Sequence, residues 1–267
     1  MKYTQTVILL LILTFTGCNK YKEQRQIIDR AENLIESHPD SAYSLLKTIK
    51  APDLMSGRLL ARWALLAGKA ADKTNEKMPA PFILEKAYNW QKRHGSHENQ
   101  AWTGLYLARA YTENKKYNDA TKIFTEAIHT ATKAKAYNAA GYLYSYFGDL
   151  YQHTLQANEE IRIRKKATEC FLKAGNKRSY ALSFRDLARP WALKDSINVA
   201  ISLLKKANQL TTALNDSKGM LSVASCLGNT YCQANKLDSA KYYLSLAMQL
   251  DTTDVAANSI AVGQLYL

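Results

Sequence analysis

The chain has 267 residues, enough for one large domain or one continuous array of repeats. It contains only 11 Gly and 5 Pro, whereas average usage of about 7% and 5% would give roughly 19 and 13, and no stretch alternates β-branched with polar residues. This composition excludes a strand-rich fold and predicts an all-α chain, while the formal net charge of +13 would suggest nucleic acid as the partner of a cytoplasmic protein.

Residues 1–17 are predicted to be an export signal. One Lys precedes an uncharged, mostly apolar run of about 15 residues, shorter than the roughly 20 of a membrane-spanning helix. Its end at Gly17 and Cys18 resembles the signal of bacterial lipoproteins, including those of Bacteroidetes, although Phe15 stands where Leu is usual. The resemblance implies a lipid-modified Cys18 and a short tether over 18–22. An uncleaved anchor and an ordinary leader are the alternatives.

The residues after Cys18 bear on location. Bacterial lipoproteins retained at the inner membrane often carry Asp directly after the Cys, and here Asn19 follows. Surface-export signals are rich in acids past the Cys, and "NKYKE" is not. By this resemblance we expect a lipid-anchored protein of the cell envelope, at the outer membrane and facing the periplasm. An exported chain has no access to nucleic acid, so we expect no nucleic-acid partner.

From residue 61 onward, certain residue types return every 40 positions. A small residue stands at Gly68, Ala108, Gly148, Ala188 and Gly228. An aromatic residue follows three positions later at Tyr111, Tyr151, Trp191 and Tyr231. A second small residue stands at Ala120, Ala200 and Ala240. A fixed period of this length indicates a solenoid of helical hairpins.

This pattern resembles the tetratricopeptide repeat (TPR) family over residues 61–254, most clearly in "LARAYTENKKYNDATKIFTEA" and "LGNTYCQANKLDSAKYYLSLA". The resemblance implies a right-handed α-solenoid in which small residues lie where the two helices of a hairpin cross closely. We assign residues 23–267 to the array, with hairpins at 23–50, 61–94, 101–134, 141–175, 181–214 and 221–254 and a partial final helix. Because the usual TPR period is 34 residues, the longer period predicts either longer helices or longer connections.

The third of the regular hairpins departs from the pattern. After "YFGDLY", the pattern expects a pair of alanines at positions 160 and 167. The pair is found seven residues later, at Ala167 and Ala174. This shift predicts that the second helix of this hairpin is displaced by seven residues.

In the TPR family the first helix of each repeat lines a concave groove. Mapped onto this sequence, that resemblance gives the candidate binding residues Arg62, Lys69, Trp102, Arg109, Asp149, Arg185, Arg189 and Asn229. The basic members suit an acidic or carboxylate-ended peptide, because guanidinium groups pair well with carboxylates. The alternative is that these basic residues only bridge neighbouring repeats.

No residue pattern indicates catalysis, a cofactor or a metal. His94 and His97 lie in a link between repeats and have no third ligand nearby in sequence. Cys226 and Cys232 are six residues apart on one helix, which turns their side chains about 120° apart and prevents them from pairing. We found no phosphate-binding loop, nucleophile elbow or helical metal motif.

Two hypotheses on function follow. The first is a non-enzymatic scaffold, lipid-anchored in the bacterial envelope, that holds a protein or peptide segment in its groove. The second is the sensory region of a membrane-bound regulator, because exported TPR regions of this kind precede a transmembrane helix and a DNA-binding part in gut anaerobes. The apolar end "NSIAVGQLYL" fits a truncated copy of such a regulator.

Overall fold

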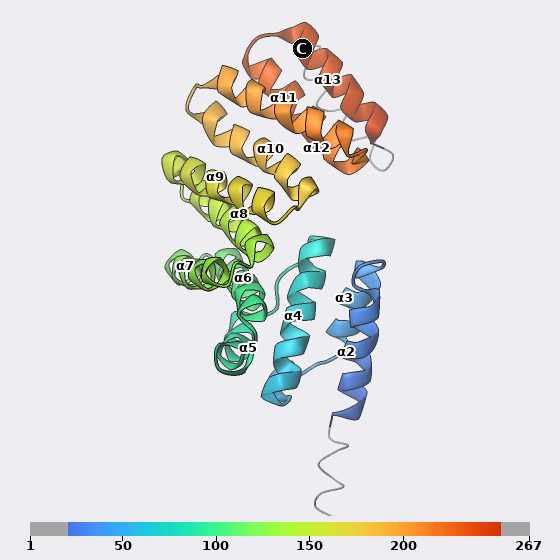
Figure 1. Ribbon diagram of the computed structural model, residues 1–267. Coiled ribbons are helices and arrows are strands. Elements are labelled where there is room, and N and C mark those ends of the chain that lie inside the picture. The colour runs from blue at the N-terminus through green and yellow to red at the C-terminus, as the bar shows by residue number, and fades with distance from the viewer. Residues whose placement is uncertain (1–20, 252–267) are drawn as a thin grey trace, which may run out of the picture. The chain divides into compact units, whose positions relative to one another are not determined.

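The computed structural model describes residues 21–251. The predicted signal, Cys18, most of the tether and the predicted final helix lie outside these residues. The described part is all-α, with no strand between residues 21 and 251 (Figure 1). Its helices are α2 (Lys22–Leu34), α3 (Pro39–Lys47), the 3-10 turn η1 (Pro52–Leu54), α4 (Gly57–Thr74), α5 (Pro81–His94), α6 (His97–Glu113), α7 (Tyr117–Lys133), α8 (Tyr137–His153), α9 (Ala157–Lys173), α10 (Lys177–Leu193), α11 (Ile197–Ala213), α12 (Ser217–Gln233) and α13 (Leu237–Leu250).

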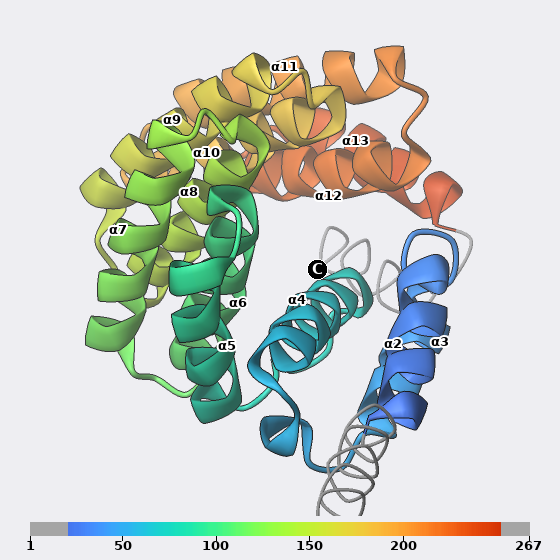
Figure 2. The same ribbon diagram turned by 60° about the horizontal axis from the view of Figure 1, so that its bottom comes forward.

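The chain forms two compact units, Met1–Glu126 and Ala127–Leu267, with the boundary inside α7. In each unit, consecutive helices pack as hairpins, as Figures 1 and 2 show for α4 with α5 and for α10 with α11. We call α4, α6, α8, α10 and α12 the first helices and α5, α7, α9, α11 and α13 the second helices. In the second unit, α10 contacts α9 and α11 and also the first helix α12.

The 40-residue period comes from longer helices. From α6 to α12 every helix has 17 residues, and three residues separate each helix from the next. Two helices and two links therefore span one period, and the connections are at the short end of the range for antiparallel helices.

Each three-residue link closes in the same way. Its middle residue has a positive φ, as at Lys115, Lys135, Leu155, Gly175, Asp195, Asn215 and Asn235. The N–H of the next residue donates to the carbonyl five positions earlier, for example Gln156 to Tyr151 at 2.9 Å and Lys236 to Tyr231 at 3.0 Å. This is the bond of a Schellman motif, which satisfies carbonyls that the helix end leaves free.

The small residues at the 40-residue spacing lie where two helices approach closely. A Cβ added to Gly228 would stand 2.5 Å from Cγ of Leu244 on α13, closer than carbon atoms can approach. The alanines in the equivalent position, Ala108 and Ala188, are buried. The second set of small residues, Ala120, Ala200 and Ala240, is fully buried. Large apolar residues such as Phe184, Leu204 and Leu227 complete the core of the second unit.

The predicted displacement of the second helix in the third hairpin is wrong. Helix α9 begins at Ala157, 40 residues after α7 and 40 before α11, so its register is regular. Ala167 occupies its ordinary repeat position on α9. The residue in the position of Ala120, Ala200 and Ala240 is Glu160, which is buried together with Arg164. A charged pair thus takes the place of the expected small and apolar residues.

The link at Leu155 contains removable backbone strain. Leu155 has a φ of 57°, and its side chain is 88% exposed, so it gains nothing from packing. A non-glycine residue in the left-handed region costs about 1–2 kcal/mol. We expect Leu155→Gly to increase the free energy of unfolding by about 1 kcal/mol and to raise Tm by roughly 2–4 °C in thermal unfolding followed by circular dichroism.

Leu172→Gly is the matched control. Leu172 is also exposed but lies within α9, where glycine lowers helix stability by about 1 kcal/mol. A lower Tm for Leu155→Gly as well would show that the turn gains no stability from glycine.

Candidate functional site

The second unit contains a cavity of about 820 Å³, built mainly from the first helices α8, α10 and α12. Helix α8 contributes Asp149 and Gln152, α10 contributes Arg185 and Arg189, and α12 contributes Asn229. The remaining lining residues are Arg164, Asp186, Ala188, Ala192, Leu193, Asp195, Ile197, Leu204, Ser222, Cys226, Thr230 and Gln233. Four of the candidate residues predicted from the sequence therefore lie around one space, although their role in binding stays a prediction.

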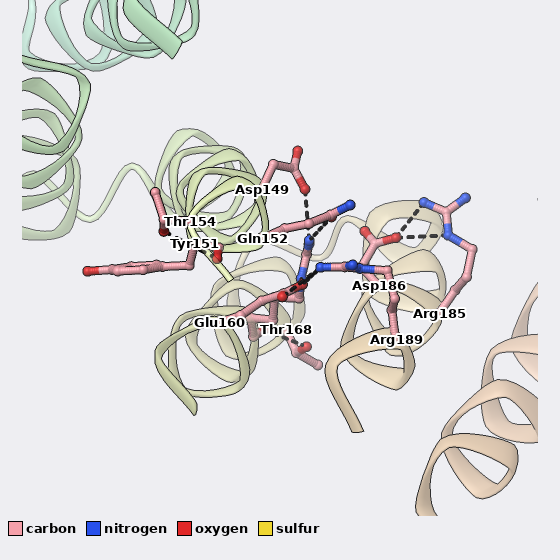
Figure 3. Close-up of polar contacts among 10 residues, drawn as sticks. Asp149, Tyr151, Gln152, Thr154, Glu160, Thr168, Arg185, Asp186 and Arg189 are labelled. Atoms are coloured by element: carbon pink, nitrogen blue, oxygen red, sulfur yellow. Dashed lines mark hydrogen bonds and ion pairs between the residues drawn. The ribbon is translucent and has the colours of Figure 1, made fainter. Parts of the chain in front are cut away.

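A buried ionic cluster joins three helices beside this cavity (Figure 3). The side chain of Glu160 on α9 is 1% exposed, and that of Arg164, one turn further on, is 5% exposed. Arg164 Nε donates to Glu160 Oε1 at 2.7 Å, and its Nη2 donates to Asp149 Oδ1 on α8 at 2.8 Å. Arg189 Nη2 on α10 donates to Glu160 Oε2 at 2.7 Å. Burying these charges is tolerable because each has an opposite partner within hydrogen-bond distance.

The cluster fits the space that glycine leaves on α8. A Cβ on Gly148 would lie 2.9 Å from Cγ of Arg164, as one on Gly228 would meet Leu244. Arg164 therefore packs its aliphatic stem where other repeats place a large apolar side chain, and it carries its guanidinium towards Asp149. Burial raises the pKa of Asp149, and the opposite charge of Arg164 counteracts that shift.

Arg185 links α10 to α12. Its Nε donates to Asp186 Oδ1 at 2.8 Å, and its Nη1 donates to Ser222 Oγ at 2.7 Å. Arg189, one turn later, lines the cavity, and its Nε is buried without a hydrogen-bond partner among residues 21–251. Two guanidinium groups therefore line the cavity, those of Arg185 and Arg189.

The candidate residues of the first unit form ion pairs between hairpins. Arg62 on α4 pairs with Asp29 of α2 at 2.6 Å and with Glu32, while Lys69 pairs with Glu36. Hydrogen bonds from Lys69 and Lys73 lower the pKa of Glu36 from 4.5 to about 2, so this carboxyl stays ionised at neutral pH.

The other two candidates of the first unit lie on α6. Arg109 pairs with Asp72 of α4, and Trp102 stacks on Tyr106 with ring centroids 6.3 Å apart. All five basic candidates, Arg62, Lys69, Arg109, Arg185 and Arg189, therefore contact a residue of another hairpin. Contacts of this kind fit the alternative stated in the sequence analysis, in which the basic residues bridge neighbouring repeats.

Glu160, Arg164 and Asp186 were not among the candidates predicted from the sequence. The available signal was the interruption of the alanine pattern at position 160, followed by Arg four residues later on the same helix. Between residues 21 and 251, no group of His, Cys, Asp and Glu residues could hold a metal ion. Cys170, Cys226 and Cys232 are free thiols, and burial raises the pKa of Cys170 and Cys226. These two thiols are therefore protonated at neutral pH.

The buried cluster predicts a non-additive pair of substitutions. Glu160→Ala leaves Arg164 and Arg189 short of a buried carboxylate, so we expect the free energy of unfolding to fall by about 3 kcal/mol in urea denaturation. Adding Arg164→Leu recreates the Ala and Leu of the next repeat, Ala200 and Leu204. We expect this double variant to regain most of the lost stability.

A double variant no more stable than Glu160→Ala alone would contradict this. It would mean that Arg164 stabilises the hairpin through contacts other than its pair with Glu160. The double-mutant cycle separates the two cases because both residues lie on one helix and share partners.

Comparisons with known proteins give structural likeness only. No family model matches the sequence, and no curated protein matches it. The apo form of RapI has a TM-score of 0.69 at 13% identity, covering 92% of this chain and 69% of that chain.

Two further solved structures are similar over more than 90% of this chain. The STAND signal transduction ATPase PH0952 of Pyrococcus horikoshii, which has a tetratricopeptide repeat sensor, has a TM-score of 0.57 at 14% identity, covering 93% of this chain and 42% of that chain. Acl4, the assembly chaperone of RpL4, has a TM-score of 0.54 at 12% identity, covering 91% and 95%. At these identities the likeness establishes the fold, and the chain is a TPR-like helical solenoid.

Proposed function

We propose that this protein is a non-enzymatic scaffold that binds a segment of another protein in the cavity of the second unit. The observation that carries the proposal is the convergence of Asp149, Arg185, Arg189 and Asn229, from three successive first helices, on one space of about 820 Å³. A cavity of this size accommodates a few residues of an extended segment.

The polar groups around the cavity favour a segment that presents a carboxylate. Arg185 and Arg189 supply guanidinium donors, and the buried Nε of Arg189 has no partner within the described chain. A side-chain or terminal carboxylate can accept hydrogen bonds from these guanidinium groups. The amides of Gln152, Asn229 and Gln233 can bond the backbone of the same segment. Because the arginines are already paired with carboxylates, recognition depends on direct hydrogen bonds more than on a long-range positive field.

Two considerations support a binding role in place of catalysis. The thiols of Cys170 and Cys226 have raised pKa values, which disfavours the nucleophilic thiolate. One of the similar structures is named for an assembly chaperone, a protein that acts by binding another.

Site-specific photo-crosslinking tests this proposal. We expect a benzophenone amino acid at position 229, in the cavity, to form a covalent adduct with a partner in intact cells. The same group at position 218, an exposed residue near the start of α12 that does not line the cavity, is the control. Mass spectrometry then identifies the partner.

Equal adducts from both positions would place the contact elsewhere on the protein and overturn the cavity as the binding site. A second variant, Asn229→Trp, fills the cavity while leaving the ion pairs intact. It should abolish co-purification of the crosslinked partner without changing the helical circular dichroism.

We further propose that the scaffold is lipid-anchored through Cys18 in the bacterial cell envelope, at the outer membrane and facing the periplasm. The support is the apolar run that ends at Gly17 and Cys18 and the non-acidic residues that follow. Within residues 21–251, no helix is both long and apolar enough to cross a membrane.

Fractionation of cells tests the anchor. We expect wild-type protein to sediment with the outer membrane and to incorporate labelled palmitate, because acyl chains partition into the bilayer. Cys18→Ser should prevent labelling and move the protein away from the membrane fraction. A Cys18→Ser protein that stays with the outer membrane would show that another part of the chain holds it there.

The second candidate is the sensory region of a membrane-bound regulator. It is favoured by the likeness to PH0952, whose tetratricopeptide part is named as a sensor. The coding sequence downstream of position 267 tests it: a transmembrane helix and a DNA-binding part in the same reading frame would support a regulator. An immediate stop codon would contradict an intact regulator and leave only a truncated copy of one.

A further inference from the structure

Among the described residues, the second unit carries the larger share of the net positive charge, +8 for residues 127–251 against +4 for residues 21–126. Between residues 127 and 251 there are seventeen Lys and Arg residues and nine Asp and Glu residues. The arginines of the cavity are held in the ion pairs described above, so they do not account for an outward positive field. The remaining excess lies on exposed lysines.

Four of these lysines form a repeating pair on the second helices. Lys165 and Lys166 on α9 are exactly one period before Lys205 and Lys206 on α11, and all four are exposed. We call these four residues the lysine stripe. None of them lines the cavity, and none forms an ion pair with another residue between 21 and 251. Figures 1 and 2 show α9 and α11 on either side of α10.

Acidic residues do little to neutralise the lysine stripe. Helix α11 contains no Asp or Glu. On α9, Glu159 is paired with Arg162 at 2.6 Å, and the exposed Glu169 is the acid within one turn of Lys165. The outward surface of α11 otherwise carries the neutral residues Val199 and Ser202.

Aromatic rings hold lysines of the stripe in the same place in successive hairpins. The Nζ of Lys166 lies 5.7 Å from the ring centroid of Tyr144, and that of Lys206 lies 4.2 Å from the ring centroid of Phe184. Tyr144 and Phe184 are themselves one period apart. The ammonium groups of Lys166 and Lys206 therefore lie over aromatic rings at equivalent positions, in side chains that are exposed.

We propose that the lysine stripe is a docking surface for an anionic phospholipid bilayer. A row of ammonium groups on a long helical surface, with few acids beside it, complements the spread negative charge of lipid headgroups, and each lysine near such a surface contributes about fivefold to binding. A single acidic protein segment is the competing partner. It is less well matched, because the four charges lie on two separate helices and outside the cavity of the second unit.

Vesicle binding tests this directly. The protein starts at residue 18 and carries Cys18→Ser, so it has no acyl chain and loses none of the described helices. We expect it to co-sediment with vesicles of phosphatidylcholine and phosphatidylglycerol, to bind phosphatidylcholine alone weakly, and to dissociate at high salt. Replacing all four stripe lysines by Gln should lower the partition coefficient by about tenfold or more.

The charge-matched control replaces Lys50, Lys77, Lys116 and Lys122 by Gln, four exposed lysines outside the second unit. It loses the same charge and should bind almost as wild type does. Equal loss in both variants would show that net charge and not the stripe drives binding. Absence of wild-type binding to anionic vesicles at low salt would overturn the proposal and favour an acidic protein partner. Circular dichroism and Tm check that both variants fold, and crosslinking from position 229 should be unaffected in either case.

Discussion

The hydrogen bond that closes each three-residue link is the constraint on which the array depends. It runs from the residue after the left-handed position back to the carbonyl five residues earlier, at the same place in each period. Because each helix ends at an equivalent residue, the same positions meet at each crossing. Most of these left-handed residues are not glycine, so packing between the helices outweighs a backbone cost of about 1–2 kcal/mol at such links.

The α8–α9 hairpin differs from the other hairpins in the residues that hold its two helices together. Elsewhere a small and a large apolar residue fill the crossing, as Ala240 and Leu244 do beside Gly228. In the α8–α9 hairpin, Glu160 and Arg164 occupy these positions and contact α10 through Arg189. Desolvating such a pair offsets much of its attraction, so it adds less to stability than its short contacts suggest. The same cluster holds Asp149 and Arg189 at the edge of the cavity.

Much of the fold could be predicted because it depends on residues at a fixed spacing. The recurrence of Gly68, Ala108, Gly148, Ala188 and Gly228 indicated both the hairpins and their period. The same reasoning failed at position 160, because alanine was used as the marker of register. A buried glutamate is tolerated at position 160 because arginines from two helices donate hydrogen bonds to it. Neither the burial nor these contacts can be seen in a single sequence.

The polar contacts of the candidate groove residues also could not be predicted from the sequence. Arg109 meets Asp72 from 37 residues away, and Arg185 meets Ser222 across the same separation. Such partners are nearly one period apart, so they become evident only after the hairpins are stacked in register. The sequence therefore indicated which positions share a surface in the second unit, but not that its basic residues already have partners.

The charged crossing in α8–α9 also bears on how such an array can change its length. Arrays with a constant period grow and shrink by gaining or losing whole hairpins, and a crossing made of small and apolar residues does not need one particular neighbour. A recombination point between Asp149 and Arg189 would separate buried charges from their counterparts. We expect the stretch from α8 to α10 to be inherited as one block, which keeps two of the cavity's first helices, α8 and α10, together.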